Sequence, residues 1–169
     1  MTMTKEFVYE GKAIYFLGKA YSLKIREGGN GKRVRAERLP DCFLVQGSRL
    51  TKERIKAALE DWYIYNARIR FKNRCAHYAP LIGVTYHDIR IKNQKSRWGS
   101  CSGQGNLNFN WKLIMAPEEV LDYLVVHELC HRKHMNHSKE FWALVASILP
   151  DYKKQERWLR DNENKVLIW

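Results

Sequence analysis

The sequence predicts an α+β fold: an N-terminal antiparallel β meander, a long scaffold helix, a β hairpin and a helical C-terminal third. Three observations favour this class. Short alternating segments fill the first part of the chain, apolar residues then recur at helical spacing, and a strictly alternating segment at 106–111 precedes further helical patterns. With 169 residues, of which 45% are hydrophobic, we expect a single globular domain over residues 1–169.

The β-rich part of the domain covers about residues 1–50. Glycines and a turn signal at Pro40 and Asp41 separate its apolar segments, and a glycine-rich stretch at 28–31 has the composition of a hairpin turn. Consecutive short strands joined by such turns predict a meander of three or four strands. The candidate strands are residues 14–16, 21–25, 33–36 and 42–45.

A long helix is predicted over residues 51–78, and we interpret it as scaffold. Thr51 has a side chain suited to capping the helix start. The apolar residues that follow recur at helical spacing, which predicts a face packed on the sheet. They are Ile55, Leu59, Trp62, Tyr63, Tyr65 and Ile69.

Residues 84–114 are predicted to supply the remaining strands. Residues 84–91 alternate in polarity, and the run NLNFNW at 106–111 alternates strictly. The glycine-containing run KSRWGSCSG between them predicts a turn and therefore a hairpin. Pro117, followed by two glutamates, then begins the helices expected over residues 117–163.

The segment VVHELCHRKHMNHSKEFW, residues 125–142, contains the spacing H-E-x-x-H at His127, Glu128 and His131. On a helix the two histidines lie one turn, about 6 Å, apart on the same face. Two imidazoles so placed can share one Zn²⁺ at about 2.0–2.1 Å each. Glu128 points about 100° around the helix from His127, beside the metal, which suits a base acting on metal-bound water.

A catalytic zinc usually takes three protein ligands, and two further histidines are candidates for the third. His134 lies about 10 Å along the helix axis from His127, too far for convergence from a straight helix. His137 follows Asn136, which can take the left-handed conformation that ends a helix and turns the chain back. We therefore expect His137 to be the third ligand, and His134 to lie behind the ligands or face solvent.

The run HELCHRKHMNHSKEFW, preceded by QKSRWGSCSGQGNLNFNWKLIMAPEEVLDYLVV, resembles the YgjP-like metallopeptidase family, which is related to the SprT-like proteins. The resemblance extends to the opening GKAIYFLGKAYSLKI and to the helix near residues 51–78. It implies a zincin-like active-site helix, zinc bound by His127, His131 and His137, and Glu128 as the catalytic base.

The function expected is that of a zinc-dependent metallopeptidase, which hydrolyses peptides or unfolded proteins with metal-bound water activated by Glu128. Arg97 could stabilise the oxyanion or hold a substrate carboxylate or phosphate, or it could pair with an acidic residue while Trp98 anchors the turn. Two alternatives remain at this stage. One is a metal-dependent nucleoside-triphosphate pyrophosphatase, for example acting on UTP, and the other is a zinc-stabilised nucleic-acid-binding module.

The formal net charge of +12 indicates a basic surface that attracts nucleic acid or nucleotides, although it is also typical of a soluble basic protein. No run of about 18 apolar residues predicts a membrane span. Four widely spaced cysteines and a start without a long apolar segment favour a cytoplasmic protein with reduced thiols. The oligomeric state is not predicted.

Overall fold

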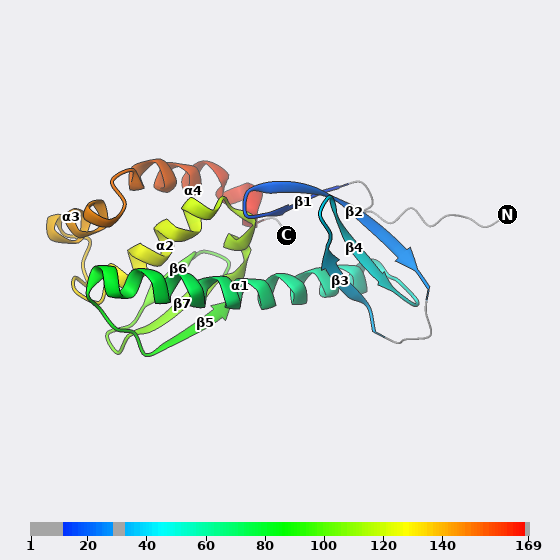
Figure 1. Ribbon diagram of the computed structural model, residues 1–169, viewed down its shortest axis with the longest axis horizontal. Coiled ribbons are helices and arrows are strands. Elements are labelled where there is room, and N and C mark those ends of the chain that lie inside the picture. The colour runs from blue at the N-terminus through cyan, green and yellow to red at the C-terminus, as the bar shows by residue number, and fades with distance from the viewer. Residues whose placement is uncertain (1–11, 29–32, 168–169) are drawn as a thin grey trace.

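The computed structural model describes residues 12–28 and 33–167 and shows an α+β fold, as predicted (Figure 1). A long helix, α1, runs along the molecule, with a four-stranded sheet at its N-terminal end and a three-stranded sheet beside its C-terminal half. The elements in chain order are β1 Ala13–Phe16, β2 Lys19–Glu27, β3 Arg35–Arg38, β4 Cys42–Gly47, α1 Lys52–Ile82, β5 Asp88–Lys92, β6 Gly99–Cys101, β7 Asn106–Asn110, the 3-10 helix η1 Trp111–Met115, α2 Glu118–Cys130, α3 Lys139–Ile148 and α4 Tyr152–Leu167.

The N-terminal sheet is not the antiparallel meander that we predicted. Its strand order is β1-β2-β4-β3, and β2 pairs with β4 in parallel, with Leu23 opposite Phe43. The reason lies in the side chains, because β4 is almost wholly buried whereas β3, with the sequence RAER, is mostly exposed. A charged strand is suited to a sheet edge, so β3 lies outside β4. The glycine-rich turn expected at 28–31 lies outside the described residues except for Gly28.

Helix α1 connects the two sheets. Thr51 caps its start by accepting a hydrogen bond from the Arg54 backbone nitrogen, as predicted. Near its first third the Tyr63 hydroxyl donates to the carbonyl oxygen of Tyr15 at 2.7 Å, and further on Phe71 stacks on Phe109 of β7 with 4.3 Å between ring centroids. The helix continues past the predicted end at residue 78, through Pro80, because Ala79 and Ile82 of its last turn are buried, and it ends at Gly83 with a φ of 74°.

The second sheet has the order β5-β7-β6. β5 pairs with β7 in parallel and begins at Asp88, later than expected, so the hairpin that we predicted between residues 84–91 and 106–111 is wrong. The antiparallel partner of β7 is β6, which lies within the segment that we expected to be the turn. This order leaves β5 and β6 at the two edges. Within the described residues no helix combines the length and hydropathy needed to cross a bilayer. The cysteines, Cys42, Cys75, Cys101 and Cys130, are free thiols.

An ion pair ties α2 to α1. Arg74 on α1 donates from Nε and Nη2 to the two carboxylate oxygens of Asp122 on α2, at 2.6 and 2.7 Å, and the Tyr78 hydroxyl donates to the same carboxylate at 3.0 Å. The Asp122 side chain is only 13% exposed. A bidentate pair in this partly buried position fixes the two helices relative to each other.

We predict that Asp122→Ala lowers the free energy of unfolding by about 2–3 kcal/mol, because it leaves the Arg74 guanidinium partly buried without its partner. Urea denaturation followed by circular dichroism measures this change. Glu60→Gln is the matched control, because it removes a more solvent-accessible pair with Lys56 at 3.9 Å, and it should cost less than about 0.5 kcal/mol. Equal losses in the two variants would contradict a structural role for the Arg74–Asp122 pair.

Candidate active site

The H-E-x-x-H motif lies on a helix that is sunk into the core. Most side chains of α2 are buried, and Glu128 is only 4% exposed. Polar groups in such a position are costly unless a partner satisfies them. The helix ends at Cys130, so His127 lies in its last turn and His131 is the C-cap residue, with φ −62° and ψ −16°.

The chain after α2 turns differently from our expectation. We expected the helix to reach a left-handed Asn136, but among the described residues only Leu17 and Arg49 are non-glycine residues with positive φ. Instead the helix tightens at once, because the backbone nitrogens of Arg132 and Lys133 donate to the carbonyl oxygens of Leu129 and Cys130, three residues back. The turn over residues 131–137 then brings His137 back beside the end of α2.

The structure brings His127, His131 and His137 together. One ring nitrogen from each can be chosen so that all three lie within 4.8 Å of one another. The Nε2 atoms of His127 and His137 are 3.1 Å apart. Two nitrogens bound to one tetrahedral zinc at about 2.05 Å would be separated by about 3.3 Å. Three imidazoles at this spacing fit a transition metal ion.

His134 contributes its backbone and not its ring. The Nδ1 atom of His131 lies 2.9 Å from the carbonyl oxygen of His134, so Nδ1 carries the proton and donates it. This tautomer leaves the Nε2 lone pair of His131 free for a metal, an arrangement common among ligand histidines. The position of His134 therefore agrees with the expectation that it lies behind the ligands, because its carbonyl oxygen contacts the ring of His131.

Helix α3 supports the imidazoles with aromatic rings. Ser138 caps α3 by accepting a hydrogen bond from the Phe141 backbone nitrogen. The Phe141 ring stacks on His131, with centroids 4.5 Å apart, and Trp142 stacks on His137 at 5.7 Å. These flat contacts limit ring rotation, so the histidines are held in place before any ligand arrives.

Burial also sets the charge of the site. Desolvation, with smaller contributions from His131 and His137, lowers the pKa of His127 to about 3. His127 is therefore neutral at physiological pH, which is the form that binds metals. The Nδ1 atom of His127 is buried and has no hydrogen-bond partner among the described residues. Coordination of a metal through Nε2 would therefore add a strong polar interaction to an imidazole ring that makes few polar interactions.

Glu128 lies next to the ligands in sequence but faces the second sheet. A Cβ atom placed on Gly99 of β6 would lie 2.9 Å from the Glu128 Oε1 atom and 3.1 Å from the Asn108 carbonyl oxygen. Burial raises the pKa of Glu128 to about 8. No described residue forms an ion pair or hydrogen bond with its carboxyl group, which is therefore available for proton transfer.

Arg97 is not brought into contact with the histidines. The carbonyl oxygen of Arg97 accepts a hydrogen bond at 3.2 Å from the buried side chain of Asn110. The same Asn110 side chain also donates to the carbonyl oxygen of Gln94. The side chain of Arg97 is exposed. No described acidic residue pairs with Arg97, so the structural alternative of an ion pair is not seen. The substrate role of Arg97 stays a prediction. Trp98 packs against the core, as the anchoring interpretation expected.

Two residues that support the site were missed at the level of sequence. Gly99 allows the close approach of Glu128 to β6, and Asn110 holds the loop before β6 through its side chain and through its backbone nitrogen, which donates to Trp98. Each left a signal. A glycine inside a strand marks a close approach, and a fully buried asparagine at the end of an alternating strand requires hydrogen-bond partners.

Two solved structures are similar to this chain. The crystal structure of the metallopeptidase zymogen of Pyrococcus abyssi abylysin is similar, with a TM-score of 0.50 and 23% identity over 55% of this chain and 95% of that one. That of Methanocaldococcus jannaschii jannalysin, also a metallopeptidase zymogen, has a TM-score of 0.49 and 22% identity over 54% and 95%. The first likeness shows a shared fold. No curated protein matches the chain in sequence.

The family described as YgjP-like, metallopeptidase domain, matches residues 2–162. Since this match covers nearly the whole sequence, the chain belongs to the YgjP-like metallopeptidase family and is a hydrolase of the metallopeptidase class.

Proposed function

We propose that the chain is a zinc-dependent endopeptidase, in which His127, His131 and His137 hold the ion and Glu128 is the general base. The observation that carries the proposal is that one ring nitrogen from each of three histidines lies within 4.8 Å of the others, while Glu128, the neighbour of His127 in the chain, carries a buried carboxyl group that pairs with no described residue. A purely structural zinc site usually has a fourth protein ligand, and among the described residues only these three form such a group.

When bound, zinc would polarise the scissile carbonyl group and make water a stronger nucleophile at neutral pH. The residues of the chain supply the proton transfers. A carboxylate oxygen of Glu128 takes a proton from the attacking water and gives it to the leaving amine nitrogen. The pKa of Glu128, raised to about 8 by burial, would fall beside a divalent cation, because the cation favours the carboxylate.

The position of β6 supports a peptide as substrate. β6 is an edge strand of the second sheet, and its Gly99 lies against Glu128. An extended peptide can add to such an edge through backbone hydrogen bonds, independently of its side chains. This arrangement would place a scissile bond near the general base.

We predict that zinc binds with a stoichiometry of one, and that His127→Ala, His131→Ala and His137→Ala each abolish tight binding. Dialysed protein is measured by isothermal titration calorimetry and by inductively coupled plasma mass spectrometry. His134→Ala is the matched control. It should keep one zinc ion, because His134 acts through its backbone carbonyl group. Loss of zinc in His134→Ala with retention in His137→Ala would contradict the proposed ligand set.

We predict that Glu128→Gln retains the zinc ion but lowers casein cleavage by about 10²–10⁴-fold, because the amide cannot accept the proton of water. Cleavage is followed by mass spectrometry of the fragments, with nucleoside triphosphates tested in parallel. Pyrophosphate release by the wild type, lost in Glu128→Gln and without casein fragments, would reject the peptidase chemistry for this site.

We predict that Gly99→Ala lowers kcat/KM by about 10²-fold without loss of zinc, since the added methyl group would displace the Glu128 carboxyl group. Gly103→Ala is the control from the turn of the same hairpin, because a Cβ atom there meets no atom within 4 Å, and its activity should be unchanged. Peptidase assays and zinc analysis of both variants test this. Wild-type activity in Gly99→Ala would show that the contact with β6 does not position Glu128.

A further inference from the structure

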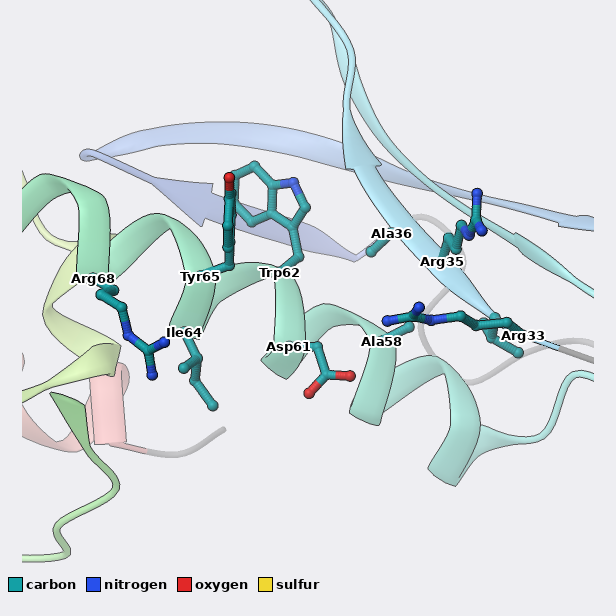
Figure 2. Close-up of a pocket in the computed structure, with 10 residues that line it drawn as sticks. Arg33, Arg35, Ala36, Ala58, Asp61, Trp62, Ile64, Tyr65 and Arg68 are labelled. Carbon is teal, nitrogen blue, oxygen red and sulfur yellow. The ribbon is translucent and has the colours of Figure 1, made fainter.

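A second surface feature lies far from the histidines. A groove of about 610 Å³ separates β3 from the N-terminal half of α1. Arg33 and Arg35 line it from the β3 side, and Trp62, Tyr65 and Arg68 line it from α1 (Figure 2). β3, which borders the groove, lies beside the N-terminal end of α1, whereas the end of α2 that carries the motif histidines lies toward the C-terminal end of α1 (Figure 1). The peptidase chemistry proposed above makes no use of the groove.

The groove carries a net positive charge. Three arginines, Arg33, Arg35 and Arg68, line the groove together with a single acidic residue, Asp61. None of the three forms an ion pair or side-chain hydrogen bond with a described residue, in contrast to Arg74, which is engaged by Asp122. Planar guanidinium groups without partners are well suited to phosphate oxygens.

Aromatic side chains accompany the arginines. Tyr65 is 66% exposed, which makes it the most exposed large hydrophobic residue of the described chain. Trp62, by contrast, is fixed by edge contacts with Phe16 and Phe43, at 5.1 and 4.7 Å between ring centroids, and forms a rigid wall of the groove. The ring of Tyr65 therefore has a face free to stack on a planar ligand.

The same features continue along α1. Tyr65, Arg68 and Lys72 are spaced at i, i+3 and i+7, so they lie on one face of the helix over about 10 Å. An aromatic ring followed by cations along one helix face can contact a base and the phosphates that follow it in a single strand. Sequence-independent binding of single strands uses this combination of a positive groove and a stacking ring.

We propose that the groove between β3 and α1 binds single-stranded nucleic acid, with a base stacked on Tyr65 and phosphates held by Arg33, Arg35 and Arg68. A duplex is a poorer ligand, because its base faces are already stacked and cannot reach Tyr65. An acidic peptide could pair with the arginines but would leave the tyrosine face unused. The proposal does not depend on the zinc peptidase mechanism.

The test measures fluorescence anisotropy of a labelled oligothymidylate of about 12 nucleotides with the zinc-loaded full chain, between about 50 and about 200 mM salt. We expect Tyr65→Ala to weaken binding by about 5- to 100-fold, with little change in the salt dependence. A blunt duplex of the same length should bind more weakly than the single strand and should be insensitive to Tyr65→Ala. Because Tyr65 is exposed, the melting temperature of this variant should stay close to that of the wild type.

Two triple variants separate local contacts from net charge. The first triple variant combines Arg33→Gln, Arg35→Gln and Arg68→Gln. It should reduce the magnitude of the slope of log affinity against log salt concentration by about 2, since each phosphate contact on a single strand contributes about 0.7. The control combines substitutions to Gln at three exposed residues of α4, which lower the net charge of +12 equally and should change the slope much less. These residues are Lys153, Lys154 and Arg160.

Several results would overturn the proposal. They are the absence of oligothymidylate binding at about 50 mM salt, equal effects of the two triple variants, or an unchanged affinity in Tyr65→Ala. Displacement of the oligothymidylate by polyglutamate at equal charge concentration, with no effect of Tyr65→Ala, would assign the groove to acidic peptides instead. Because peptidase activity does not enter these measurements, failure of the proposed zinc chemistry would leave their outcome unchanged.

Discussion

The burial of α2 is the constraint on which the candidate site depends. This helix places Glu128 in surroundings from which water is largely excluded, and it leaves the first motif histidine, His127, partly buried. Isolated charges are unstable there, so the histidine is held neutral and the pKa of the glutamate is raised. A divalent cation would bind neutral imidazoles and would favour the ionised form of a nearby carboxyl group, so it would lower the raised pKa of the glutamate. The apolar surroundings of the motif therefore make the site chemically responsive to metal.

The neighbours of α2 fix the position of each group around it. Arg74 anchors the middle of the helix to α1, and the rings of Phe141 and Trp142 hold two of the histidines from α3. On the opposite side Gly99 allows β6 to approach Glu128. The site is thus assembled from elements far apart in the sequence, all of which pack against one buried helix.

The parts of this arrangement that follow from local periodicity could be predicted from sequence. Local geometry alone determines three of these features, which are the spacing of His127 and His131, the cap at Thr51 and the alternation of β7. The gathering of His137 with the motif was also expected, but the predicted left-handed Asn136 was wrong, because hydrogen bonds back to Leu129 and Cys130 turn the chain earlier. The roles of Gly99 and Asn110 depend on contacts across the sheet, which no local pattern specifies.

The parallel pairing of β2 with β4 has a consequence for how the chain folds. Partners such as Leu23 and Phe43 are separated by the whole of β3, so this part of the sheet cannot form by simple closure of a hairpin. The β3–β4 pair involves a short loop and can form early, whereas β2 must find its place through a longer loop with a larger entropic cost. The N-terminal sheet should therefore mature more slowly than the β6–β7 hairpin, and kinetic folding experiments would detect its assembly as a late phase.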